Sequence, residues 1–143
     1  MPDTPETIIA FDFGLRRIGV AVGQQVTHSS NALETIANSE SGPDWLRIDE
    51  IIREWGPQRL IVGMPLHADG SPSETSERVS SFVAELDRFE LPIETVDERY
   101  SSVEAQAVLK SQRARGLRGR ISKESIDSTA AMLIAERWLK NKR

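Results

Sequence analysis

Three acidic residues, Asp12, Glu98 and Asp127, lie at positions where a carboxylate is either energetically costly or able to bind a ligand. Asp12 interrupts the apolar run Ile8–Phe13, and a charge within a buried strand requires an ionic partner or a bound cation. Glu98 follows the apolar segment 92–96, so it is expected at the carboxyl end of a strand, where open α/β sheets place their ligand sites. Both positions therefore suit a carboxylate that binds a cation or another ligand.

Asp127 is predicted to face inward from the last helix of the chain. With Ala131, Ile134 and Trp138 it forms a row with helical spacing, which places its carboxylate on the stripe that packs against a sheet. It lies too far along this helix to be the N-cap, a role better suited to Ser122. The sequence thus predicts a third inward-facing acid.

Each acid also has a purely structural alternative. Asp12 could cap the turn that follows its strand, Glu98 could pair with Arg99, and Asp127 could favour the positive end of a helix dipole. Taken together, however, clustered carboxylates repel one another unless a cation neutralises them, and oxygen ligands suit Mg²⁺ or Mn²⁺. Two such ions about 3.5–4 Å apart would support phosphoryl transfer without a histidine base.

The elements that must hold these acids follow from hydrophobic periodicity. Short apolar runs predict strands at 8–13 and 18–22, joined by the tight turn Gly14–Arg17, and a third strand is expected over 26–36. Helical spacing follows over 45–55, with Asp44 or Ser41 as cap and Gly56 as stop. The later expected elements are a strand at 60–63, a helix from about Ser73, a strand at 92–96, a helix from Ser101 through Leu109 and a final helix from Ser122 to about Trp138.

This order predicts an α/β fold with a five-stranded mixed sheet flanked by helices, in a single domain spanning residues 1–143. The first three strands can form an antiparallel meander, whereas helix-separated strands require parallel crossovers. The absence of cysteine excludes a disulfide framework and a thiolate zinc site. With no signal-like or membrane-spanning apolar segment, a cytoplasmic protein is expected.

The net charge of −4 conceals a basic segment. Residues 110–123 carry six basic side chains and no acid, so the rest of the chain is more acidic than the total suggests. A local basic patch is enough to attract phosphates, although such a stretch can also be a solvated loop. Its four arginines, interleaved with two glycines, are Arg113, Arg115, Arg118 and Arg120.

Four motifs in this order resemble the YqgF/RuvX family of Holliday-junction-resolvase-like proteins, also described as pre-16S rRNA nucleases. The resemblance covers essentially the whole chain. FDFGLRRIGVA resembles the family's first signature, IVGMPLHADGS its Val-Gly-x-Pro-Leu loop, VDERYSSVEA its Asp-Glu-Arg segment and SIDSTAAMLIAERWL its Asp-x-x-Ala-Ala helix. Two departures are His67-Ala68, where Asn-Met is usual, and Ser101-Ser102, where threonine is common.

The resemblance implies a ribonuclease-H-like fold with Asp12, Glu98 and Asp127 as catalytic, metal-binding acids and Mg²⁺ or Mn²⁺ as cofactor. Arg16 and Arg99, beside two of these acids, are candidates for phosphate contacts, together with the four arginines of the basic segment. The role of Arg17 is left open between phosphate contact and pairing with an acid. A catalytic role for His67 is not favoured, and Ser102 keeps a hydroxyl.

By the same resemblance, the expected activity is phosphodiester hydrolysis in structured nucleic acid. The resemblance alone ranks precursor 16S rRNA as the first substrate and a four-way DNA junction as the second. Nothing in the residues distinguishes the two. A junction resolvase would need two active sites, hence a homodimer. The alternatives are a non-catalytic nucleic-acid-binding assembly factor and, as a weaker one, an actin-like ATPase or kinase, which usually needs two such domains.

Overall fold

The structure, a computed structural model, describes residues 5–65, 74–97, 107–111 and 123–141. Its strands form one mixed sheet in the order β4-β3-β2-β1-β5-β6. The pairs β1/β2, β2/β3 and β3/β4 are antiparallel, whereas β5 and β6 run parallel to β1. The strands are β1 (Thr7–Phe13), β2 (Arg17–Gln24), β3 (Ser29–Ser39), β4 (Gly42–Pro43), β5 (Arg59–Met64) and β6 (Ile93–Asp97).

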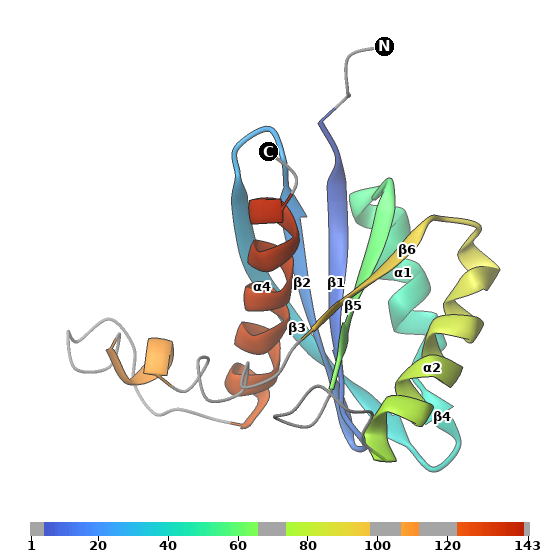
Figure 1. Cartoon of the computed structure of the whole chain (residues 1–143). Coiled ribbons are helices and arrows are strands. Elements are labelled where there is room, and N and C mark those ends of the chain that lie inside the picture. Colours follow the sequence, from blue (N-terminus) through green and yellow to red (C-terminus); the bar gives the residue numbers. More distant parts are fainter. Residues whose placement is uncertain (1–4, 66–73, 98–106, 112–122, 142–143) are drawn as a thin grey trace.

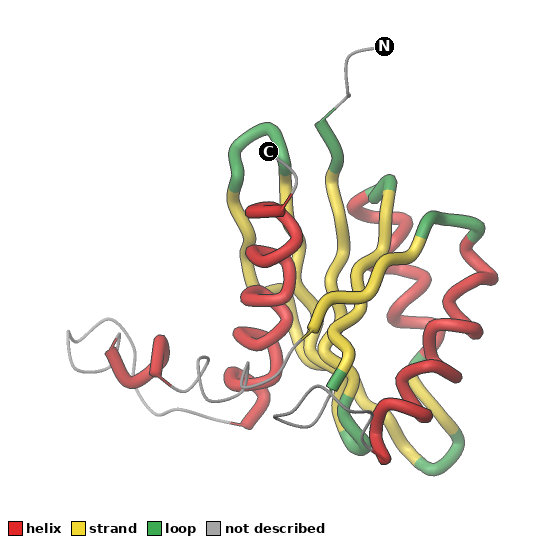
Figure 2. Tube along the Cα trace, viewed as in Figure 1, coloured by secondary structure: helices red, strands yellow, loops and turns green. Residues whose placement is uncertain are grey.

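Helices cover both faces of this sheet. Figure 1 shows α4 (Lys123–Asn141) on one side and α1 (Trp45–Trp55) and α2 (Glu74–Leu86) on the other. The same two-sided arrangement is visible in Figure 2, where the helices lie on either side of the strands. A 3₁₀ turn, η1 (Asp87–Phe89), follows α2. No helix within the described ranges is long and apolar enough to cross a bilayer.

The expected mixed sheet flanked by helices is confirmed, but the expected number of five strands is wrong. The sixth strand is β4, a two-residue segment that pairs back onto Asn38 and Ser39 at the end of β3. Gly42 turns the chain at φ +108°, a conformation that favours glycine. Because β4 is so short and directly precedes α1, its sequence resembles the start of a helix more than a strand.

The predicted third strand also had wrong limits. It was expected over 26–36, whereas β3 spans Ser29–Ser39. A turn occupies the preceding residues, since the His28 amide donates to the Gln25 carbonyl at 3.1 Å and His28 has a φ of +49°. For α1 the prediction is confirmed: the Asp44 side chain accepts from the Arg47 amide, and Gly56 ends the helix with a left-handed φ of +54°.

Two hydrophobic cores lie on the two faces of the sheet. Ile9 and Phe11 of β1 pack in the core that also contains Ile48 of α1 and Phe82 of α2. The alternate residues of β1 contribute to the other core, beneath α4. Alternation along β1 therefore assigns each of its residues to one helical layer. The members from β1, β5 and α4 in the second core are Ile8, Ala10, Ile61, Ile134, Ala135, Trp138 and Leu139.

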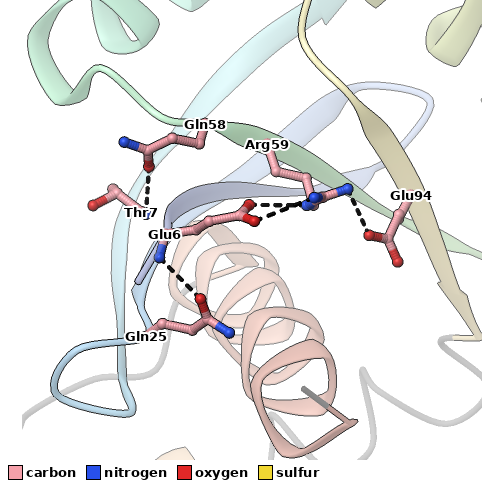
Figure 3. A network of polar contacts seen from close by, with 6 residues as sticks. All are labelled: Glu6, Thr7, Gln25, Gln58, Arg59 and Glu94. Atoms are coloured by element: carbon pink, nitrogen blue, oxygen red, sulfur yellow. Dashed lines mark hydrogen bonds and ion pairs between the residues drawn. The ribbon is translucent and has the colours of Figure 1, made fainter. Parts of the chain in front are cut away.

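A polar network fastens the start of β1 to β5 and β6 (Figure 3). Arg59 donates to Glu6 through Nε at 2.9 Å and to Glu94 through Nη1 at 2.9 Å, and its guanidinium lies 6.0 Å from the ring centroid of Trp138 in α4. The hydrogen bond to Glu6, opposed in part by burial, raises the pKa of Arg59. The network thus ties the C-terminal part of α4 to the sheet at the amino end of β1.

Candidate active site

Asp12 lies on the α4 face of the sheet, near the carboxyl end of β1. It follows Ile8 and Ala10 at two-residue spacing, and both of these residues belong to the core beneath α4. Asp12 itself is only partly buried, because the strand ends one residue later. The acid that interrupts the apolar run thus ends the buried row of β1 at the carboxyl end of this strand.

Gly19 is the common neighbour of Asp12 and Asp127. It stands directly opposite Asp12 in the antiparallel ladder between β1 and β2. A Cβ atom built on Gly19 would lie 2.0 Å from the Asp127 backbone oxygen, so the backbone of α4 rests directly on this glycine. Opposed residues in such a ladder are about 4.5–5.5 Å apart, so the fold brings the backbone of Asp127 next to that of Asp12.

The inward orientation predicted for the Asp127 stripe is confirmed. Ala131, Ile134 and Trp138, spaced along α4 from Asp127, are all buried. Asp127 is more exposed than these residues, with a side-chain exposure of 26%. It therefore lies at the open end of the interface between α4 and the sheet.

Arg17, whose role was left open, pairs with an acid. It is the first residue of β2, and its Nε donates to Oδ2 of Asp127 at 2.8 Å. Both side chains are about one third exposed or less. Between phosphate contact and pairing with an acid, the structure thus supports pairing for Arg17.

Asn38 holds the turn that carries Arg16 and Arg17. It lies at the end of β3 and is 9% exposed. Its Nδ2 donates to the Gly14 carbonyl at 2.7 Å, and its backbone amide donates to the Arg16 carbonyl at 3.0 Å. Sequence reasoning missed this residue because β3 was predicted to end at Ile36. The sequence gives no apolar signal at this position, because Asn38 is polar, and only the structure shows it buried in line with Ile36.

A shallow cavity of about 320 Å³ lies beside this turn. It is lined by Gly14, Leu15, Arg16, Arg17 and Asp127. Arg16 is exposed there, so its guanidinium is available to a ligand entering from solvent. Arg16 thus offers a cationic donor to a ligand at the same cavity that the Asp127 carboxylate lines.

Several predicted site residues fall outside the described ranges. Glu98 directly follows Asp97, the last residue of β6, and the Asp97 carbonyl accepts from Nη1 of Arg137 in α4 at 2.7 Å. The roles of these residues stay predictions. They are Glu98, Arg99, Arg113, Arg115, Arg118, Arg120, His67 and Ser102.

Asp12 and Asp127 are suitable donors for a hard cation, since both offer carboxylate oxygens on one face of the sheet. Within the described ranges no cluster of three or more Asp, Glu, His or Cys residues could hold a metal ion. The described part of the chain contributes two acids that share Gly19 as a neighbour, one of them paired with an arginine.

The chain is similar to known proteins over most of its length. The family model RuvX, described as Holliday junction resolvase, matches residues 6–141. A protein of Azotobacter vinelandii named "Putative pre-16S rRNA nuclease" is 40% identical over 136 residues, which cover 94% of each chain. A protein of the same name from Nitrosococcus oceani is 44% identical, over 96% of this chain and 89% of the relative.

Solved structures share the fold at low sequence identity. Thermus thermophilus RuvC in complex with a Holliday junction substrate superposes with a TM-score of 0.57 at 12% identity, over 95% of each chain. The yeast mitochondrial Holliday junction resolvase Ydc2 gives a TM-score of 0.55 at 12% identity, over 93% of this chain and 77% of that one. With the family model matching nearly its whole length, this chain belongs to the RuvX family.

Proposed function

We propose that this protein is a metal-dependent nuclease that hydrolyses an internal phosphodiester of precursor 16S rRNA during processing of its 5′ end. The observation that carries the proposal is the shared neighbour Gly19, which brings the α4 backbone at Asp127 next to Asp12 on β1. The names of the relatives support the choice of substrate.

Asp12, Glu98 and Asp127 would hold Mg²⁺ or Mn²⁺. When bound, two such ions would activate a water and neutralise charge on the phosphate and the leaving oxygen. Carboxylates suit these ions, and the partial exposure of Asp12 and Asp127 leaves them reachable from solvent. Glu98 is assigned to this set from its position directly after β6 and from the family resemblance.

The chain's own cations would hold the substrate. Arg16 is exposed beside Asp127 and lines the same cavity, so we assign it a contact to a phosphate near the scissile bond. Arg99 and the arginines of the basic segment would grip flanking phosphates, which would position the strand without reading its bases. Arg17 is already engaged by Asp127.

The second candidate substrate is a four-way DNA junction. It is favoured by the description of the matching family and by the resolvases among structures of the same fold. A junction resolvase cuts two strands, so this candidate requires a homodimer. A carboxylate site with metal ions attacks the phosphate in either nucleic acid, so the substrate must be decided by assay.

The test is to incubate the purified protein with labelled precursor 16S rRNA and with a synthetic four-way junction, each with Mg²⁺, with Mn²⁺ and with EDTA. Metal-dependent cleavage of the RNA at a defined site, with the junction intact, is the expected result. Cleavage of the junction alone would select the second substrate. Binding without cleavage in every metal condition would identify a non-catalytic assembly factor and refute the nuclease proposal.

A further inference from the structure

The ion pair between Arg17 and Asp127 joins the first β-hairpin to the last helix. The two residues are 110 positions apart in the chain, and the bond runs from Arg17 Nε to a single carboxylate oxygen of Asp127. Ion pairs this exposed contribute little to stability in general. Its main physical effect is therefore to restrict the rotamers of the Asp127 side chain.

The backbones behind both side chains are fixed independently of this bond. Asn38 holds the Gly14–Arg17 turn through the carbonyls of Gly14 and Arg16, and Arg17 pairs with Ala37 in the β2/β3 ladder. Asp127 is fixed by the close approach of its backbone to Gly19. With both backbones held, the guanidinium of Arg17 determines where the Asp127 carboxylate points.

We propose that Arg17 is a positioning residue that holds the Asp127 carboxylate in the orientation required for binding the catalytic cation. Its positive charge also offsets the charge of Asp127 while no metal is bound. Because the bond occupies one of two carboxylate oxygens, the other can serve a metal ion at the same time. The proposal rests on the proposed function, since it requires Asp127 to be a metal ligand.

Hydrogen-bond partners of metal-ligating side chains typically contribute about 10–100-fold in metal affinity or activity. Arg17→Met should therefore lower kcat by about 10–100-fold at saturating substrate and Mn²⁺, with little change in KM. Arg17→Lys should recover part of kcat, because lysine keeps the charge and a donor but lacks the planar guanidinium.

Arg53→Met is the matched control for this change. Arg53 Nε lies 2.8 Å from Oδ2 of Asp49, so this ion pair joins the same two atom types at the same distance as the Arg17–Asp127 pair. It is more exposed and lies on α1, which packs on the opposite face of the sheet. Its removal deletes one arginine and one ion pair without touching the site. It should leave kcat and KM unchanged.

Two measurements do not depend on cleavage. A double-mutant cycle of Arg17→Met and Asp127→Ala in metal-free protein should show a small non-additive term in the unfolding midpoints, because each single change removes the same weak bond. Calorimetry should show that Arg17→Met binds Mn²⁺ more weakly than the wild type does. If the wild type cleaved no nucleic acid but both results held, the nuclease proposal would fail and the positioning role of Arg17 would stand.

Three results would overturn the positioning role. A raised KM with unchanged kcat would mean that Arg17 grips the substrate instead. Tighter Mn²⁺ binding with undiminished kcat would mean that Arg17 merely competes with the metal. Additive midpoints in the cycle, together with unchanged Mn²⁺ affinity, would mean that the pair is an ordinary surface ion pair.

Discussion

Gly19 and the Asp127 carbonyl oxygen are in such close contact that a single added carbon does not fit between them. An ideal Cβ on Gly19 would lie 2.0 Å from that oxygen and 2.4 Å from the carbonyl carbon. The obstacle is backbone, which cannot rotate away as a flexible side chain can. This contact sets how closely the first turns of α4 approach β2, and thereby the separation of the two acids.

Gly19→Ala should therefore push α4 away from the sheet and abolish cleavage. Overpacking of this kind typically costs about 1–3 kcal/mol in the free energy of unfolding. Gly23→Ala is the control, since it lies on the same strand and a Cβ there would first meet the Ile8 side chain at 3.0 Å. Denaturant melts and cleavage rates should separate the two variants, and an active Gly19→Ala would contradict the role of this contact.

Asp12→Asn, Glu98→Gln and Asp127→Asn should each abolish metal-dependent cleavage and leave the fold intact, because each removes the charge of a metal ligand. Circular dichroism and single-turnover cleavage are the measurements. Glu77→Gln, an exposed acid on α2, is the control and should cleave at the wild-type rate. Near-normal turnover in any one of the three would remove that residue from the mechanism.

Divalent metal should stabilise the wild type more than the triple variant of these acids. A ligand that binds only the folded state raises the free energy of unfolding by about 2.7 kcal/mol when its concentration is 100 times Kd. Thermal melts across a Mg²⁺ or Mn²⁺ titration measure this difference. Equal shifts in both proteins would place the metal elsewhere.

Asn38→Ala should destabilise the protein, because the Gly14 carbonyl loses its side-chain donor. This bond is partly buried, and the loss of a typical hydrogen bond costs about 0.5–1.5 kcal/mol. Asn31→Ala on the same strand, where the side chain is exposed, should have little effect on the unfolding midpoint. If the two variants melted alike, the bond from Asn38 would not be what holds the turn.

Replacing Arg113, Arg115, Arg118 and Arg120 by alanine should weaken substrate binding and flatten its salt dependence. Each lost phosphate contact lowers the slope of log K against log salt by about 0.7 for a single strand and about 0.9 for duplex DNA. The single-turnover rate at saturating enzyme should change much less, because no metal ligand is altered. An unchanged slope would show a solvated segment, and a collapsed saturating rate would place an arginine in the transition state.

The mixed sheet, its flanking helices and the inward face of α4 were predictable from the sequence, because local periodicity determines which side chains a strand or helix buries. Asp12 in an apolar strand and Asp127 on an apolar helical stripe were recognisable for the same reason. The caps of α1 at Asp44 and Gly56 follow from local backbone chemistry and were predicted as well. These features depend on residues that are close together in the chain.

Contacts between distant segments were decided only by the tertiary structure. Pairing of Arg17 with Asp127 depends on the register of β2 against β1 and on where α4 crosses them, and no local pattern encodes either. In the sequence Gly19 is an ordinary strand glycine, and only the fold places the α4 backbone against it. Asn38 can hold the Gly14–Arg17 turn only because β3 continues beside that turn. Local propensity fixes which face a residue takes, whereas its partner across the fold depends on packing between elements far apart in sequence.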